Sequence, residues 1–266
     1  MRIADALSQA QIDRVDAEAL LSWVLRCDRA YLHAHPELTL HGDALDLFQK
    51  FALRRREGEP VAYIKGEREF YGRRFMVDRR VHIPRPSTEN LVALALEFLE
   101  HPRDMERDLE PGIVGVTRVL KKSATPHVIV DVGTGSGCIA ITMALERQDL
   151  RVIATDASRG ALDVARLNAE GLGAAKRIEF LQGDLLEPLK SIREPFVVLS
   201  NPPYLSRSAI DARPDLSREP RMALDGGLHG SETIAQLLSQ ARSVEQCVGL
   251  IIECGVDQVA EGASAP

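Results

Sequence analysis

The sequence predicts an α/β protein with a doubly wound, mostly parallel sheet, preceded by a small helical domain and a β-hairpin. From residue 126 onward, short apolar segments alternate with longer segments of helical period, which is typical of a parallel sheet with helices on both faces. Residues 61–85 alternate β-forming and charged side chains, which predicts the hairpin. The residues before them show helical periodicity alone, for example at Ile3, Ala6, Leu7 and Ala10.

We therefore expect an N-terminal helical domain at residues 1–60, a hairpin linker at 61–85 and an α/β domain at 86–266. The helical domain has neither a glycine-rich loop nor a nucleophile beside a base, so its expected role is to recognise a substrate. His33 and His35 lie close together in it, but no further ligands are nearby, and we expect no metal site.

The α/β domain should contain five buried strands. Their expected segments are VIVDVG (128–133), RVIATD (151–156), RIEFLQGD (177–184), PFVVLSNPPY (195–204) and GLIIECG (249–255). Residues 101–125 are polar and irregular, and we expect them to form an excursion on the surface. Ligands of such sheets bind at the carboxyl ends of the strands, and the candidate site residues all lie there.

The composition restricts the partners of the protein. A formal net charge of −6 over 266 residues argues against a broad surface for nucleic acid. The four dispersed cysteines form no C-x-x-C pair, and we find neither a signal peptide nor an apolar run of about 18 residues. We therefore expect a cytoplasmic protein without a membrane partner. Candidates for a local basic patch, which solvated helix ends and a hairpin face explain equally well, are Arg54, Arg55, Arg56, Arg73, Arg74, Arg79 and Arg80.

A glycine-rich loop follows the first buried strand, with the sequence Asp131-Val-Gly-Thr-Gly-Ser-Gly137. Gly133, Gly135 and Gly137 allow a tight turn and let a ligand approach the bare backbone. The spacing G-x-G-x-G differs from the G-x-G-x-x-G that binds a pyrophosphate. Alone, the loop is consistent both with a site for a nucleotide-like ligand and with a turn that binds nothing.

Acidic residues end the next two strands. Asp156 can accept hydrogen bonds from both ribose hydroxyls of an adenosine-containing ligand, or it can cap the following helix, as Ser158 also could. Its spacing from the glycine-rich loop favours the ligand role. Further on, Asp184 can accept from an adenine amino group while Leu185 covers the ring.

The fourth strand ends in Asn201-Pro202-Pro203-Tyr204. Two prolines cannot continue a ladder, and they fix the backbone rigidly. The Asn201 side-chain oxygen and the Pro202 carbonyl are two acceptors that can hold both hydrogens of an NH2 group. Tyr204 offers a flat face to a planar amide or base. A proline turn leaving a strand is the alternative for this tetrapeptide by itself.

Taken together, the three strand-end motifs resemble the class I S-adenosylmethionine-dependent methyltransferases, in the branch that methylates exocyclic or amide nitrogens. The stretch EPVAYIKGEREFYGRRFMVDRRVHIPRPSTENLV at residues 59–92 is similar to the linker of the HemK/PrmC family of release factor glutamine methyltransferases. VDAEALLSWVLRCDRAYLHAHPE at 15–37 and REPRMALDGGLHG at 218–230 also match this family. The departures from the family pattern include Ser87, where an acidic residue is usual, and His82, where an aliphatic residue is usual. The acidic residue that often precedes the fourth strand is also missing from EPFVVLSNPPY.

This resemblance implies a Rossmann-like methyltransferase domain that binds S-adenosyl-L-methionine. It implies methylation of the side-chain amide nitrogen (N5) of the glutamine in the Gly-Gly-Gln motif of a peptide chain release factor. The implied cofactor residues are Gly133, Thr134, Gly135, Ser136, Gly137, Asp156, Asp184, Leu185 and Asn201. The implied substrate residues are Asn201, Pro202, Pro203 and Tyr204, of which Asn201, Pro202 and Tyr204 are catalytic and none acts as a general base.

Other functions stay open from the sequence. One is methylation of a glutamine in a ribosomal protein, and another is N6-methylation of adenine in DNA or RNA, which the charge and the 5% aromatic content disfavour. Relatives also continue through two closing strands after GLIIECG, and we expect this chain to lack them. The fifth strand would then have an unpaired edge, favouring self-association or low stability, and a cofactor-binding protein without activity is a further alternative.

Overall fold

The computed structural model describes residues 1–100, 115–120 and 126–255, and at 115–120 it describes the backbone alone. The chain divides into two compact units, residues 1–67 and residues 68–266. Within the described ranges, no helix is both long and apolar enough to cross a membrane.

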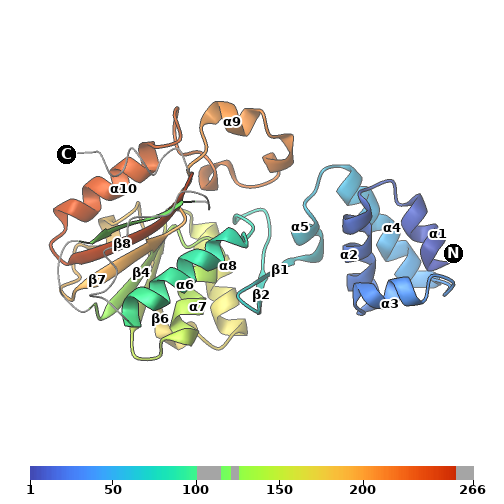
Figure 1. The fold of residues 1–266 in the computed structure, drawn as a ribbon, viewed down its shortest axis with the longest axis horizontal. Helices are drawn as coiled ribbons and strands as arrows, with labels where there is room; N and C mark the ends of the chain where they lie inside the picture. The colour runs from blue at the N-terminus through green and yellow to red at the C-terminus, as the bar shows by residue number, and fades with distance from the viewer. Residues whose placement is uncertain (101–114, 121–125, 256–266) are drawn as a thin grey trace. The chain divides into compact units, whose positions relative to one another are not determined.

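The first unit is helical (Figure 1). Asp13 and Asp28 cap the second and third helices by accepting hydrogen bonds from the backbone N–H groups of Val15 and Tyr31, which satisfies donors that a helix start leaves unpaired. The second helix packs against the other four. The helices are α1 (Ile3–Gln9), α2 (Arg14–Leu25), α3 (Arg29–Ala34), α4 (Gly42–Arg56) and α5 (Val61–Lys65).

The apolar core of the first unit draws side chains from all five helices. It includes Ile3, Leu7, Leu20, Leu21, Leu32, Phe48, Phe51 and Ile64. Glu18 is buried beside this core, and hydrogen bonds from Arg29 and Arg14 lower its pKa to about 2. The helices predicted from the periodicity of this region are therefore confirmed.

The expected hairpin is present but shorter than the sequence pattern. Its strands are β1 (Glu67–Phe70) and β2 (Arg73–Met76). The two turn residues, Tyr71 and Gly72, have φ angles of 50° and 70°, and two successive positive φ angles match the right-handed twist of a tight hairpin. The five residues Val61–Lys65, expected in the hairpin, form α5 instead, and Gly66 ends that helix in a left-handed conformation.

The second unit is built on a six-stranded sheet with the strand order β3-β8-β7-β4-β5-β6. The ladders joining β4 through β8 are parallel, as expected. Every residue of β4, β7 and β8 is buried, which is typical of strands covered on both faces. The strands are β3 (Gly115–Leu120), β4 (Val128–Val132), β5 (Arg151–Asp156), β6 (Ile178–Gln182), β7 (Phe196–Ser200) and β8 (Cys247–Cys254).

Helices cover both faces of this sheet (Figure 1). One face packs against α6 (Ser87–Glu100), α7 (Cys138–Glu146) and α8 (Arg159–Gly171), with Leu91, Ile129 and Ile141 in its core. The other packs against α10 (Glu232–Ser243), through Leu237, Val130 and Val198. A short helix, α9 (Arg207–Asp211), lies between β7 and α10. Four 3₁₀ turns complete the described structure: Ala175–Arg177, Glu187–Leu189, Pro214–Leu216 and Arg221–Ala223.

The expectation for residues 101–125 is wrong in part. Gly115–Leu120 form β3, which pairs antiparallel with β8 from Gly115 opposite Cys254 to Leu120 opposite Gly249. The edge of β8 expected to be unpaired therefore has a partner, because an earlier segment of the chain supplies the ladder that backbone groups at an edge require. The rest of 101–125 lies outside the described residues.

Candidate active site

The carboxyl ends of the parallel strands meet at one edge of the sheet. Gly133–Gly137 follow β4, Asp156 ends β5, Asp184 follows β6 and Asn201 follows β7. In the sheet, β4 lies between β5 and β7. The strand order therefore reverses at β4, with β5 and β6 on one side and β7 and β8 on the other. Ligands of open α/β sheets bind at such a reversal. The structure thus brings the candidate residues from the sequence to the same edge.

The glycine-rich loop is a tight turn that is bonded to β5. Gly133, Gly135 and Gly137 all have positive φ angles, which residues with a side chain rarely adopt. The backbone N–H groups of Gly133 and Thr134 both donate to the Thr155 carbonyl at 2.9 Å. A Cβ atom on Gly137 would lie 2.8 Å from Ile141 Cδ1, so this glycine permits close packing within the protein.

The other two glycines of the loop serve a different purpose. A Cβ atom on Gly133 would meet no atom within 4 Å, and one on Gly135 would meet only the Gly133 carbonyl oxygen, at 4.0 Å. The bare backbone at these positions therefore faces open space. A ligand can approach it closely, which fits a cofactor better than a turn that is only structural.

Asp156 holds this loop from the neighbouring strand. Its Oδ2 accepts a hydrogen bond from Gly135 N at 2.9 Å, and its Oδ1 accepts one from Ser158 N at 2.8 Å. Burial raises its pKa, while the two backbone donors act in the opposite direction. The cap of α8 is Ser158, whose hydroxyl accepts from Ala161 N. Each Asp156 oxygen keeps lone pairs for a ligand donor.

Asp131, on β4, begins the motif that contains the glycine-rich loop, but no role was predicted for it from the sequence. It is fully buried, and its Oδ2 accepts from Thr134 Oγ1 at 2.6 Å and from Ala140 N at 3.0 Å. Its Oδ1 has no hydrogen-bond partner among the described residues. Burial raises its pKa to about 7. In the sequence, the one acidic residue within an otherwise apolar strand could have indicated that Asp131 has a specific role.

The segment after β6 also turns sharply. Leu185 has a φ angle of 45°, which is unusual outside glycine, and its carbonyl accepts a hydrogen bond from the Thr155 hydroxyl at 3.4 Å. Its side chain is partly buried against the core on the α10 face, whereas Asp184 is exposed. Gly183 N donates to the Asp156 carbonyl at 3.1 Å, which ties this segment to β5.

Asn201 is oriented by a residue that the sequence reasoning did not select. Its side-chain Nδ2 donates to Thr88 Oγ1, at 3.0 Å, from the first turn of α6. Since an amide presents donors on one side and an acceptor on the other, this bond leaves Asn201 Oδ1 as an acceptor for another group. Thr88 is 2% exposed, so its hydroxyl is held by the surrounding packing.

The backbone of Pro203 and Tyr204 packs against a second glycine-rich segment, residues 226–230. A Cβ atom on Gly226 would lie 2.4 Å from the Gly230 carbonyl oxygen and 2.7 Å from the Pro203 carbonyl oxygen. Gly226 N donates to the Leu205 carbonyl, and Leu205 N donates to the Leu224 carbonyl. The tetrapeptide after β7 is therefore fixed by its prolines and by backbone contacts that only glycine allows.

Tyr204 is partly buried between this segment and the sheet. Burial raises its pKa, and the nearby Glu253 adds to the increase. Glu253 belongs to β8 and is fully buried, with its Oε1 accepting from Ser87 Oγ at 2.8 Å. Ser87 stands where the family usually has an acidic residue. Its hydroxyl donates to the buried Glu253 side chain, which an acidic side chain at position 87 would repel.

Two family models match the sequence. The PrmC N-terminal domain matches residues 1–66, and the methyltransferase small domain matches residues 111–219. A release factor glutamine methyltransferase of Nitratidesulfovibrio vulgaris is 37% identical over 266 residues, covering 97% of this chain and 81% of the relative. One of Bacillus subtilis is 40% identical over 225 residues, covering 83% and 71%. The chain belongs to the release factor glutamine methyltransferase family.

Another member of the family, from Koribacter versatilis, is 39% identical over 229 residues, or 85% of this chain and 73% of that protein. Among solved structures, the hMettl16 catalytic domain in complex with the MAT2A 3'UTR hairpin 6 has a TM-score of 0.48 and 14% identity, covering 76% of this chain and 64% of that one. TrmK of M. capricolum, in complex with S-adenosyl-homocysteine, has a TM-score of 0.35 and 18% identity, covering 48% and 45%.

Membership of this family makes the chain an S-adenosylmethionine-dependent methyltransferase. The residues at the sheet edge fit that cofactor. The open backbone at Gly133 and Gly135 lets a ligand approach closely, and Asp156 presents a carboxylate beside it. The expected α/β methyltransferase fold is confirmed by the sheet order and by the family match.

A buried acid links two segments that characterise this family in the sequence. Glu219, from the segment after the tetrapeptide, pairs with Arg85 and accepts from Ile83 N at 3.0 Å. His82 Nδ1 lies 2.7 Å from Glu219 Oε2, so the unusual histidine faces this carboxylate. Burial alone would raise the pKa of Glu219, but these neighbours bring it below its usual value.

The arginines considered for a basic patch are largely paired. Arg54 binds Glu59, Arg55 binds Asp16 and Arg56 donates to Gln11. Arg73 binds Glu146, and Arg80 binds Asp78. These pairs support solvated helix and hairpin faces at the five positions. Within the described residues there is no group of three or more potential metal ligands, and His33 instead lies 3.4 Å from Glu18.

Proposed function

We propose that this enzyme transfers a methyl group to the side-chain amide nitrogen (N5) of the glutamine in the Gly-Gly-Gln motif of a peptide chain release factor. The names of its relatives support this substrate. The observation that carries the proposal is the bond from Asn201 Nδ2 to Thr88 Oγ1. It leaves the Asn201 carbonyl oxygen, an acceptor, to meet an NH2 group.

In this proposal Asn201, Pro202 and Tyr204 are the catalytic residues. Asn201 Oδ1 and the Pro202 carbonyl each accept one hydrogen of the glutamine NH2 group, and Pro203 keeps their spacing rigid. The Tyr204 ring packs against the planar amide. An amide nitrogen is a poor nucleophile because its lone pair is delocalised into the carbonyl. Two fixed acceptors aim that nitrogen and stabilise the positive charge that develops on it.

We assign the cofactor to the strand ends beside this loop. Bound S-adenosyl-L-methionine supplies an electrophilic methyl group on a sulfonium. Asp156 accepts from the ribose hydroxyls, Asp184 from the adenine amino group, and Leu185 covers the adenine ring, while Asn201 contacts both ligands. The glycine-rich loop that receives the rest of the cofactor consists of Gly133, Thr134, Gly135, Ser136 and Gly137.

No general base is needed for this reaction. Methyl transfer leaves a cationic N-methylated amide with both of its N–H hydrogens. This cation is strongly acidic and gives up one proton to water. Asp131 is fully buried and bonded to Thr134 and Ala140, so its position supports a role in shaping the loop. The residues described at the site thus act by orientation and by fixed dipoles.

The remaining assignments are proposals of the same kind. Residues 1–60 recognise the folded substrate, residues 61–85 link the domains and residues 86–266 carry out the reaction. We also propose that the enzyme works in the cytoplasm and binds neither a membrane nor nucleic acid directly. The net charge of −6 supports this, and so do the ion pairs of Arg54, Arg55 and Arg73.

A labelling experiment with separate acceptors tests the function. The purified enzyme is incubated with radiolabelled S-adenosylmethionine and, in parallel, with a release factor, ribosomal proteins, and DNA or RNA. Label should enter the release factor alone. Label in a ribosomal protein or in nucleic acid, with none in the release factor, would contradict the proposed substrate.

A further inference from the structure

The turn formed by residues 226–230 is in direct contact with the backbone of Tyr204. A Cβ atom on Gly226 would lie 2.8 Å from Tyr204 Cα, and one on Gly230 would lie 2.7 Å from the Tyr204 carbonyl oxygen. Real Cβ atoms do not come so close to other atoms, so glycine at these two positions lets the backbones touch. The position of Tyr204 therefore depends on where this turn is held.

Backbone hydrogen bonds connect the turn to two other parts of the second unit. Gly226 N donates to the Leu205 carbonyl at 2.9 Å. The Gly226 carbonyl accepts from Glu232 N at 3.1 Å and from Thr233 N at 3.3 Å, two donors that the start of α10 would otherwise leave unpaired. Gly226 thus joins the segment after β7 to a helix that packs against the sheet through Leu237.

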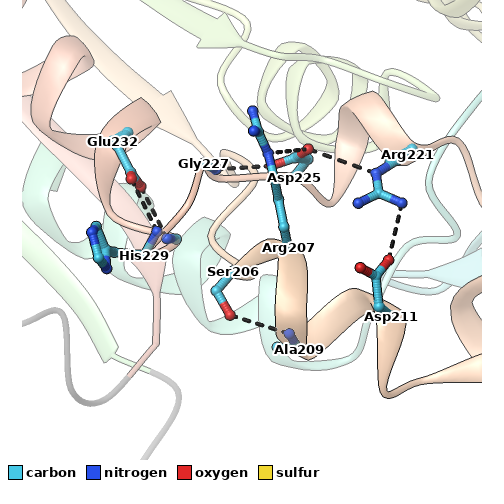
Figure 2. Close-up of polar contacts among 10 residues, drawn as sticks. Ser206, Arg207, Ala209, Asp211, Arg221, Asp225, Gly227, His229 and Glu232 are labelled. Atoms are coloured by element: carbon cyan, nitrogen blue, oxygen red, sulfur yellow. Dashed lines mark hydrogen bonds and ion pairs between the residues drawn. The ribbon is translucent and has the colours of Figure 1, made fainter.

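The side chain of Asp225 fixes the first half of the turn. Its Oδ1 accepts a hydrogen bond from Gly227 N at 2.9 Å (Figure 2). Arg207 Nε lies 3.3 Å from its Oδ2, and Arg221 Nε lies 3.7 Å from the same oxygen. The two arginine side chains are 60% and 55% exposed, and such pairs contribute little. The bond to Gly227 is therefore the contact by which Asp225 holds the turn.

The side chain of Glu232 fixes the second half of the turn. Its Oε1 accepts from His229 N and its Oε2 from Gly230 N, both at 2.9 Å (Figure 2). These bonds lower the pKa of Glu232, so the acceptor is ionised at neutral pH, and a charged acceptor makes the stronger hydrogen bond. A Cβ atom on Gly227 would collide with the same carboxylate. Glu232 therefore touches the turn at both ends.

We propose that Asp225 and Glu232 are positioning residues for methyl transfer, which act by holding the turn at residues 226–230 against Tyr204. Asp225 acts through one backbone N–H group of the turn and Glu232 through two. This inference rests on the proposed function, in which the Tyr204 ring packs against the substrate amide. Release of the turn lets Tyr204 move, and a displacement of about 1 Å near reacting groups can cost about 100-fold in rate.

The test measures kcat with an intact release factor, and the Kd for S-adenosylmethionine, in the intact enzyme and its variants. Asp225→Ala and Glu232→Ala should each lower kcat about tenfold or more. Asp225→Asn keeps an acceptor for Gly227 N and loses only the charge that Arg207 and Arg221 face, so its kcat should stay within about twofold. Glu232→Gln keeps one of two acceptor oxygens, so its kcat should lie between those of Glu232→Ala and the unmodified enzyme.

Cofactor binding and a control variant separate positioning from a general loss of structure. The Kd for S-adenosylmethionine should stay within about twofold in every variant, because the turn lies beside the proposed substrate residues. Gln236→Ala is the matched control, since Gln236 is exposed on α10, four positions after Glu232. Its kcat should equal that of the unmodified enzyme. Asp225→Asn and Glu232→Gln keep the size of the side chain and decide the question if an alanine variant does not fold.

Several outcomes would overturn the positioning role. One is a kcat of Glu232→Gln equal to that of the unmodified enzyme, and another is an equal loss in Asp225→Asn and Asp225→Ala. An equal loss in Gln236→Ala, or a rise in Kd that matches the fall in kcat, overturns it as well. If Asn201→Ala loses activity while both alanine variants keep theirs, the positioning role fails alone. If the unmodified enzyme methylates no release factor, the proposed function fails and the positioning role fails with it.

Discussion

Thr88 accepts a hydrogen bond from the side-chain amide of Asn201, with 3.0 Å between Oγ1 and Nδ2, although 113 positions separate the two residues in the sequence. The bond joins the start of α6 to the loop after β7. It decides which end of the Asn201 amide is available to a substrate, so that the residue presents an acceptor. In the proposed mechanism, selection of an amide group as the methyl acceptor thus depends on Thr88, which lies outside the Asn-Pro-Pro-Tyr motif.

Thr88→Val should therefore lower kcat by about five- to tenfold, because a net hydrogen bond contributes about 1 kcal/mol and the amide becomes free to rotate. The Kd for S-adenosylmethionine should change little. Thr88→Ser keeps the hydroxyl and serves as the control, with a kcat near that of the unmodified enzyme. Equal losses in both variants would show that Thr88 acts through packing alone.

Gly226→Ala should impair methyl transfer without weakening cofactor binding. The added Cβ would lie 2.4 Å from the Gly230 carbonyl and 2.7 Å from the Pro203 carbonyl, so residues 201–204 have to shift. A displacement of about 1 Å near reacting groups can cost about 100-fold in rate. Gly171→Ala is the matched control, since a Cβ there meets nothing within 4 Å. Full activity of Gly226→Ala would mean that the loop tolerates the movement.

Asp156→Ala should weaken S-adenosylmethionine binding by about tenfold or more, because each hydrogen bond to a charged group contributes about 1.5–3 kcal/mol. Ser158→Ala separates this effect from helix capping. Ser158 caps α8, so its loss should cost about 1 kcal/mol of stability and leave the affinity unchanged. Calorimetry would decide, and unaltered affinity in Asp156→Ala would restrict Asp156 to its bonds with Gly135 and Ser158.

The stability of the cofactor-free enzyme should carry a pH dependence that Asp131 causes. Burial raises the pKa of Asp131 from 3.8 to about 7, so the folded state binds a proton that the unfolded state has lost. Stability from this residue is therefore greatest below pH 4, declines as the pH rises towards 7, and is constant above that. The change is of the order of 4 kcal/mol at most, since one pKa unit corresponds to about 1.4 kcal/mol.

Urea unfolding of the unmodified enzyme and of Asp131→Asn, at several pH values from 5 to 8, isolates this effect. The asparagine keeps an acceptor for Thr134 and Ala140 but cannot ionise. The unmodified enzyme should lose stability relative to the variant as the pH rises to 7. A difference that stays constant with pH would show that Asp131 is ionised throughout.

The sequence allowed the parallel sheet and the strand-end motifs to be predicted, because buried parallel strands are short apolar runs and their carboxyl ends must meet. Polar contacts between distant parts of the chain could not be predicted in this way. Thr88, Ser87 and Glu219 reach their contacts across 113, 166 and 136 positions, and no local pattern encodes such separations. Each is a common polar residue that looks, in sequence, like a helix cap or a surface group.

The strand β3 was missed for a related reason. Gly115–Leu120 lies in a region that is polar and irregular in sequence, and it becomes a strand through its antiparallel ladder with β8. Edge strands need neither an apolar face nor strong propensity when a neighbour supplies the hydrogen bonds. The hairpin was overextended because the β-forming residues Val61, Tyr63 and Ile64 belong to α5, where Tyr63 and Ile64 are buried.

The most direct test of the central claim is to locate the methyl group on the product by tandem mass spectrometry. A purified release factor is incubated with S-adenosylmethionine and either the unmodified enzyme or Asn201→Ala. We expect one methyl group on the side-chain nitrogen of the Gly-Gly-Gln glutamine, formed about 10²–10³-fold more slowly by Asn201→Ala. A methyl group on any other residue, or an Asn201→Ala variant that keeps more than half of kcat, would contradict the account.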